Sequence, residues 1–296
     1  MKRFEKKETG FITQVELKQT RGQIIYWVMF AVLIVVSICT FAPPLWILVS
    51  GFKDLDEFFL VPPTIIPQSF HPEKLVEVWK KFDYILYYRN TLFVALGSIV
   101  SGVVLNGLAG YVLSRLKPKG SKAVFMMILF IMMMPNTIGM VPLYLTICDF
   151  PYMHFNMLGT FWPMWLMAAA SCFHILMFKS FFDSIPLSYI EAARIDGCSN
   201  VGIFFKIVVP LSIPVIMTVA IFIFNNSWGD FLWPYLVLNN KKLYTVSIFL
   251  FQNKAGNYSV DVYMVMLTLA IVPPVIVYAF LQKHIMGGMN LGGIKG

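Results

Sequence analysis

Long apolar stretches alternate with short polar connections along most of the chain. A stretch of about 20 apolar residues is long enough to cross the hydrocarbon core of a membrane as a helix. Five stretches reach this length and a sixth, residues 211–226, approaches it. Each predicts one membrane span: residues 24–49, 86–113, 123–147, 158–178, 211–226 and 262–281. The pattern therefore predicts an all-α integral membrane protein with six transmembrane helices.

Prolines modify two of these spans. Pro43 and Pro44 are expected to bend the outer end of the first span, because a proline removes a helical hydrogen bond. Pro135 and Pro142 are expected to interrupt the third span for the same reason.

The largest hydrophilic segment, residues 51–85, follows the first span. Its first part contains several prolines and is expected to be irregular. Residues 73–84 carry apolar side chains at helical spacing, which predicts an amphipathic helix at the outer membrane interface.

A second polar segment, residues 186–210, separates the fourth and fifth spans. Its first part, up to Ile195, predicts a short helix that Gly197 ends, because glycine adopts the left-handed cap conformation without a Cβ penalty. Its second part carries apolar side chains at helical spacing, namely Val201, Phe204, Phe205 and Val208. Two short helices joined by a turn in a polar segment are not suited to cross a membrane, so we interpret this segment as a docking element for another protein.

Basic residues indicate the orientation of the chain. With six spans both ends lie on one side of the membrane, and the side richer in Lys and Arg faces the cytoplasm. The side that holds both ends and the segment 186–210 carries 15 of the 23 Lys and Arg residues. Both termini and this segment are therefore predicted to be cytoplasmic. We expect a cytoplasmic tail at residues 1–23, a transmembrane domain at 24–285 and a second cytoplasmic tail at 286–296.

Composition excludes several classes of protein. With 58% hydrophobic residues, 13% charged residues and a mean hydropathy of +0.73, the chain is not an ordinary soluble protein. The net charge of +8 lies at the ends of the apolar stretches, so it does not indicate binding to nucleic acid. The four cysteines lack the spacing of a metal or redox site, and we interpret them as packing residues. The sequence contains no Gly-x-x-x-x-Gly-Lys-Ser/Thr phosphate loop, so no nucleotide site and no catalytic residue is expected on this chain.

One motif resembles that of a known family. The pattern Glu191-Ala192-Ala193-x-x-Asp196-Gly197, followed by Ile203-Phe204-x-x-Ile207-x-x-Pro210, resembles the signature loop of the membrane subunits of bacterial ATP-binding-cassette (ABC) importers. Other stretches resemble the carbohydrate branch of that family, the maltose-type permeases: residues 89–92, 110–115, 134–135, 141–144, 227–234 and the Gly-rich C-terminal end. The resemblance covers residues 20–296 and implies the type I ABC importer fold, with a core at residues 86–285.

The resemblance also implies a role and a set of partners. In such importers the signature loop is a cytoplasmic coupling helix that docks on an ATPase subunit. This implies coupling roles here for Glu191, Ala192, Ala193, Asp196, Gly197 and Phe204. Two ATPase subunits would bind ATP and Mg²⁺, so this chain would carry no cofactor of its own. A second, related permease chain and an extracytoplasmic sugar-binding protein would complete the importer in the bacterial plasma membrane, and the C-terminal tail would reach between the ATPase subunits.

A sugar path is expected to combine aromatic rings with a few polar groups at membrane depth. Candidate residues for this path are Asn106, Asn136, Trp162, Asn225 and Trp228. Each has a structural alternative, because Trp near a span end belongs to the interfacial aromatic belt and Asn inside a span bonds a neighbouring helix.

Other transport functions remain as alternatives. The cargo of an ABC importer could instead be a polyol or a peptide. A secondary transporter is disfavoured because the spans carry no unpaired charge near their middle. A membrane enzyme is disfavoured because no set of His, Cys or carboxylate residues is clustered in the sequence.

Overall fold

The computed structural model describes residues 20–135, 137–254 and 257–289, and every regular element in this part of the chain is helical. Its α-helices are α1 (Thr20–Ser50), α2 (Glu73–Lys81), α3 (Tyr84–Tyr111), α4 (Ser121–Met133), α5 (Met140–Cys148), α6 (Trp162–Ala169), α7 (Cys172–Ser184), α8 (Leu187–Ile195), α9 (Asn200–Ile203), α10 (Val209–Leu211), α11 (Ile213–Gly229), α12 (Leu232–Val237), α13 (Val246–Gln252) and α14 (Val260–Met289). Two π-helical turns, η3 (Val112–Leu116) and η4 (Phe204–Val208), and two 3-10 turns, η2 (Leu55–Phe59) and η5 (Lys241–Leu243), complete the set. The predicted all-α class is confirmed.

Three helices are long and apolar enough to cross a membrane as continuous elements: α1, α3 extended by η3, and α14. Two more stretches reach this length only as bent pairs. These are α6 with α7, which are bent by 40°, and the segment from α9 to α10 with α11, which are bent by 74°. Helix α4 has 13 residues and is too short to cross alone. The first, second and sixth predicted spans are therefore continuous helices, and the other three consist of shorter pieces.

Two of the predicted spans differ from expectation in their internal breaks. The sequence predicts a continuous fourth span, but the structure breaks it between Ala169 and Cys172. The third span is broken around Pro135, as predicted. The predicted interruption at Pro142 is wrong, because this proline lies in the first turn of α5, where the helix does not need its N–H.

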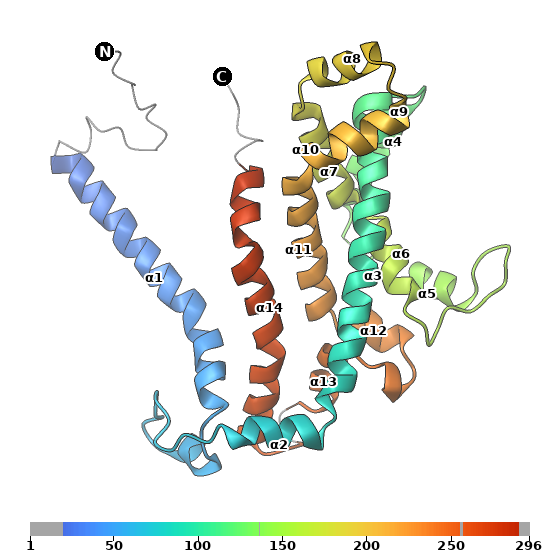
Figure 1. Cartoon of the computed structure of the whole chain (residues 1–296). Coiled ribbons are helices and arrows are strands. Elements are labelled where there is room, and N and C mark those ends of the chain that lie inside the picture. The colour runs from blue at the N-terminus through green and yellow to red at the C-terminus, as the bar shows by residue number, and fades with distance from the viewer. Residues whose placement is uncertain (1–19, 136, 255–256, 290–296) are drawn as a thin grey trace.

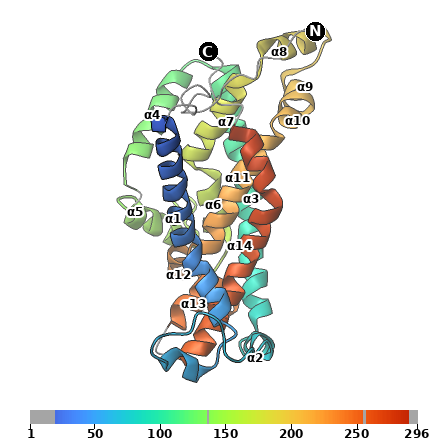
Figure 2. The same cartoon turned by 90° about the vertical axis from the view of Figure 1, so that its left-hand side faces the viewer.

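Helix α3 is the central element of the bundle. It contacts α6, α7 and α11, while α11 contacts α14 and α14 contacts α1. The two views agree that α3, α11 and α14 run side by side, whereas Figure 1 shows that α1 lies near α14 at the end that carries α2 and diverges from it toward the opposite end (Figure 1, Figure 2). A displacement of α3 would therefore displace the helices that contact it, which form most of the bundle.

Glycines on α3 permit this close packing. A Cβ atom at Gly110 would lie 2.7 Å from Cβ of Phe178 and 3.0 Å from the backbone nitrogen of Lys179, both on α7. At Gly102 a Cβ atom would lie 3.1 Å from the carbonyl oxygen of Ala168 on α6. Small residues let helices approach closely in a membrane, where packing rather than hydrophobic exclusion drives their association.

The molecule has two ends of different character. The start of α1, the end of α14 and the segment 186–210 lie at one end, and we call this segment the elbow (Figure 1). Helices α2, α12 and α13 lie at the opposite end, which we call the outer end (Figure 1). Helices α12 and α13, which lie between the fifth and sixth predicted spans, were not predicted from the sequence. Helix α14 continues to Met289, beyond the boundary predicted at residue 285, and residues 290–296 lie outside the described part of the chain.

Ionic contacts fix the hydrophilic segment at the outer end. The Lys74 ammonium donates to Asp54 Oδ1 at 2.7 Å and to Asp261 Oδ2 at 3.2 Å, which joins this segment to the first turn of α14. His71 lies between Glu73 and Asp54, at 2.6 and 2.9 Å. The hydrogen bond to Glu73 raises the pKa of His71, and the hydrogen bond from Lys74 lowers the pKa of Asp54 to about 2.

Candidate functional site

Helix α8 of the elbow ends in a backbone motif that requires a left-handed residue. Gly197 has a φ of +78°. Its N–H donates to the carbonyl of Arg194 at 3.1 Å, and the N–H of Cys198 donates to the carbonyl of Ala193 at 2.9 Å. This pair of bonds is a Schellman motif, which satisfies two carbonyls that the end of a helix leaves free. The predicted cap at Gly197 is confirmed.

The second arm of the elbow also begins with a local cap. The Ser199 hydroxyl accepts a hydrogen bond from the N–H of Gly202 at 3.2 Å and so caps the start of α9. The chain then passes through η4 and α10 before it bends into α11. Both arms are therefore shaped by residues within the elbow itself.

The inner face of the elbow packs on the bundle. Its side chains are buried and belong to one apolar cluster with residues of α7 and α11: Ile190, Ala193, Ile203 and Val208 from the elbow, and Phe178, Phe182, Val215 and Val219 from the two helices. This packing holds the elbow against the ends of the helices that precede and follow it.

The outer face of the elbow carries large apolar side chains that no other part of the described chain covers. Ile195 is 86% exposed and Phe205 is 63% exposed. The exposed apolar residues are Leu187, Tyr189, Ile195, Val201 and Phe205, and the charged side chains of Glu191, Arg194 and Asp196 lie among them. We call this set the docking surface. An exposed apolar patch with polar residues around it is typical of a protein interaction site.

The six residues expected to couple to a partner divide between the two faces. Glu191, Ala192, Asp196 and Gly197 are exposed, whereas Ala193 is buried. Phe204 turns inward, and its ring centroid lies 4.8 Å from that of Tyr111 at the end of α3. The sequence interpretation missed Leu187, Tyr189 and Ile195, although helical spacing places Leu187 and Ile195 on the same face as Glu191.

Two of the predicted path residues bond neighbouring helices. The Asn106 amide donates to the carbonyl of Ala168 at 2.8 Å and accepts from the N–H of Ser171 at 3.1 Å. It thereby satisfies backbone groups at the break between α6 and α7. The Trp228 indole N–H donates to the carbonyl of Ala270 on α14 at 3.0 Å, and its side chain is buried. These contacts favour the structural alternative for both residues.

The other predicted path residues are exposed or outside the described chain. Trp162 is the first residue of α6 and is exposed, and Asn136 lies outside the described residues. Asn225 and the adjacent Asn226 are exposed on α11, and within the described chain neither amide side chain makes a hydrogen bond. Phe222 lies one turn earlier on α11 and is also exposed.

An aromatic contact extends this exposed face of α11 onto α7. The ring centroid of Phe173 lies 6.1 Å from that of Phe222. Together the two phenylalanines and the two asparagines form what we call the α11 stripe. The sequence interpretation missed both aromatic residues, because their pairing depends on the packing of α7 against α11.

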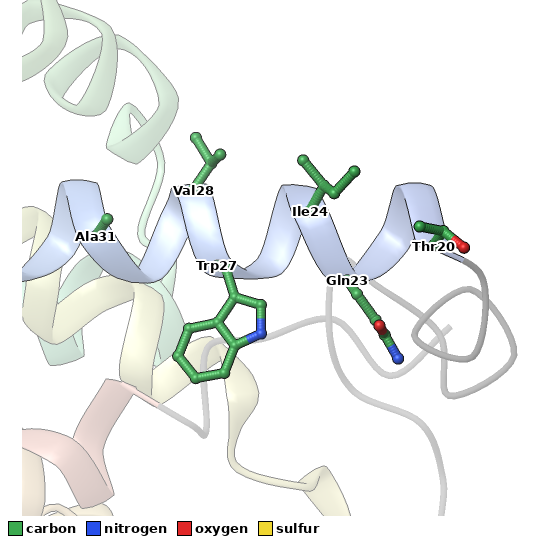
Figure 3. Close-up of a pocket in the computed structure, with 6 residues that line it drawn as sticks. All are labelled: Thr20, Gln23, Ile24, Trp27, Val28 and Ala31. Atoms are coloured by element: carbon green, nitrogen blue, oxygen red, sulfur yellow. The ribbon is translucent and has the colours of Figure 1, made fainter.

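Two surface hollows lie outside these sites. One runs along α1 and is lined only by residues of that helix, so it is a groove of helix surface (Figure 3). The other lies beside the elbow end of α3 and is lined by four lysines, Lys117, Lys119, Lys122 and Lys179. Within the described residues no group of His, Cys, Asp or Glu has the arrangement of a metal site.

The fold is that of a helical membrane protein, and its elbow packs on the bundle by one face and exposes apolar side chains on the other. Residues 98–290 match the family described as binding-protein-dependent transport system inner membrane component, and the chain belongs to this family.

Two relatives and one solved structure agree with this assignment. The probable ABC transporter permease protein YurM of Bacillus subtilis (strain 168) is 30% identical over 93% of this chain and 89% of its own length. The arabinooligosaccharides transport system permease protein AraQ of Halalkalibacterium halodurans is 27% identical over 95% and 100%. A chain from the crystal structure of a bacterial ABC transporter involved in the import of the acidic polysaccharide alginate has a TM-score of 0.78 at 21% identity, over 93% of this chain and 99% of that one.

These findings confirm the family that the motif at Glu191 predicts. The chain is a permease subunit of an ABC importer in the inner membrane, and ATP hydrolysis takes place on a separate ATPase subunit.

Proposed function

We propose that this chain forms one half of the translocation path for a sugar or oligosaccharide and couples that path to ATP hydrolysis through the elbow. The observation that carries the proposal is the division of the elbow into two faces. Its inner face packs on α7 and α11, while the docking surface has no partner in the described chain. A partner that moves the elbow therefore acts directly on the helices that line the bundle.

The proposed topology has six spans with both termini in the cytoplasm. Helices α4 and α5 together supply the third span, and the two bent pairs supply the fourth and fifth. The excess of Lys and Arg on the side of the termini supports this orientation. The elbow then faces the cytoplasm, where an ATPase subunit can dock, and the outer end faces an extracytoplasmic sugar-binding protein.

The α11 stripe is our candidate for the path. An amide side chain without a hydrogen bond is costly in contact with lipid, so Asn225 and Asn226 require cover by protein, water or cargo. A second, related permease chain placed against this face would enclose a path lined by aromatic rings and amides. Such a lining suits a neutral polar cargo. We therefore propose a heterodimer of permeases with two ATPase subunits that bind ATP and Mg²⁺.

We infer the cargo from the relatives of this chain. The relative AraQ, which spans nearly the same length, is described as an arabinooligosaccharide permease. Since a shared fold does not select a cargo, polyols and peptides remain the alternative cargoes.

Uptake measurements in cells test this proposal. A strain without this chain should lose uptake of one labelled oligosaccharide and keep the uptake of labelled polyols and dipeptides, and the wild-type chain should restore the loss. Asn225→Ala should raise the half-saturating sugar concentration, whereas Ser37→Ala, on the distant helix α1, should not. Loss of polyol or peptide uptake instead would assign the other cargo. Uptake that persists without ATP hydrolysis would contradict the proposed coupling.

A further inference from the structure

We propose that the cytoplasmic end of α3, together with the following turn η3, clamps the chain at both ends of the elbow through Tyr111, Ser114 and Arg115, so that α3 and the elbow move as one body during transport. This inference rests on the proposed coupling role of the elbow. It adds three positioning residues, none of which belongs to the docking surface or to the α11 stripe.

The turn that follows α3, η3, has an unusual geometry. Residues Val112–Leu116 form a π-helical turn, and the N–H of Lys117 donates to the carbonyl of Val112 at 2.9 Å. A π turn inserts one residue relative to an α-helix and rotates the side chains that follow it. Lys117 ends the turn with a φ of 45°, in the left-handed region. This geometry places Ser114 and Arg115 against the end of α7.

Ser114 and Arg115 hold the end of α7, from which the chain enters the elbow. The Ser114 hydroxyl, which is buried, donates to Asp183 Oδ1 at 2.6 Å. The Arg115 guanidinium donates to the carbonyls of Phe182 and Ile185. These groups lie at the end of α7, directly before the elbow, and the Phe182 carbonyl also accepts a hydrogen bond from the N–H of Ile185 at 3.2 Å. A charged donor on such carbonyls forms a strong hydrogen bond.

Tyr111 holds the arm that leaves the elbow. Its ring lies 4.8 Å from that of Phe204, centroid to centroid, and 6.1 Å from that of Phe182. One turn of α3 therefore touches the chain both before α8 and after α9. Because α3 also contacts α6, α7 and α11, a shift of the elbow is transmitted to the helices that carry the α11 stripe.

The test measures import and ATP hydrolysis separately on the assembled importer in proteoliposomes. Arg115→Ala should leave co-purification of the ATPase unchanged and keep ATP hydrolysis. The cargo imported per ATP hydrolysed should fall several-fold. Arg115→Lys, which keeps one charged donor, should restore part of the ratio. Lys119→Ala, in the next connection, is the matched control and should behave as wild type.

A second pair of variants tests the other arm. Tyr111→Ala should lower the same ratio, whereas Tyr111→Phe keeps the ring and should not. An unchanged ratio in both Arg115→Ala and Tyr111→Ala would overturn the clamp. Loss of the ATPase from the Arg115→Ala complex would also overturn it, because the residue would then serve the folding of the elbow. A wild-type chain that retains no ATPase would instead contradict the proposed function.

Discussion

Replacement of Gly197 by valine should weaken the docking of the ATPase on the elbow without disturbing the bundle. A Cβ atom at this position would meet nothing within 4 Å, so the substitution creates no clash. The cost arises from the backbone alone, because Gly197 has a φ of +78° and forms the Schellman motif that ends α8. A β-branched residue is especially unfavourable in this conformation.

The left-handed backbone at Gly197 determines the expected loss of affinity for the ATPase. An L-residue in the left-handed region costs roughly 1–2 kcal/mol relative to glycine. If the elbow relieves this strain by adopting a different backbone conformation, its affinity for the ATPase should fall by about 5- to 30-fold. Gly197→Asn should stay closer to wild type, because asparagine tolerates left-handed backbone.

The assay titrates purified ATPase subunits onto the permease assembly in nanodiscs and measures binding by interferometry. Gly120→Val is the matched control, since Gly120 also has a positive φ, of +90°, with nothing within 4 Å, but lies outside the elbow. Equal losses of affinity in Gly197→Val and Gly120→Val would refute the reasoning, because strain would then act through general instability. Wild-type affinity in Gly197→Val would refute it as well.

Two further predictions concern stability. Gly110→Leu should push α3 away from α7 and lower the thermal unfolding midpoint in detergent, as overpacking costs about 1–3 kcal/mol, whereas Gly229→Leu has open space and should not. The hydrophilic segment 51–85 should resist proteolysis best at mildly acidic pH. The hydrogen bond to Glu73 raises the pKa of His71, so the stability that protonated His71 contributes is complete below pH 6.5 and is lost as the pH rises through the raised pKa. His71→Gln should remove this dependence on pH. The lowered pKa of Asp54, caused by the hydrogen bond from Lys74, adds stability above 3.8 that is lost only as pH falls towards about 2.

The elbow was predictable because its structure is local. Gly197 and Ser199 cap the two arms through contacts that span only a few residues. The long apolar stretches were equally informative, since α1, α3 and α14 follow them closely. Local patterns of this kind are visible in one sequence.

The break between α6 and α7 and the hydrogen-bond partners of the polar residues were not predictable, because they depend on distant parts of the chain. The break between α6 and α7 is stabilised by Asn106, which lies more than 60 residues earlier in the chain. Because of these contacts, the side chain of Asn106, a predicted path residue, is engaged with the backbone of Ala168 and Ser171. Trp228 bonds a carbonyl of α14 in a similar way. In contrast, the inward position of Ala193 follows helical spacing and could have been predicted.

The most direct test of the central claim is purification of this chain, with an affinity tag, from its native membranes in mild detergent. Our account predicts that an ATPase, a second multi-span permease and ATP hydrolysis activity will co-purify with it, and that a sugar-binding protein will stimulate that activity. Recovery of the chain alone, with no ATPase and no hydrolysis, would contradict the claim that the elbow couples this permease to ATP.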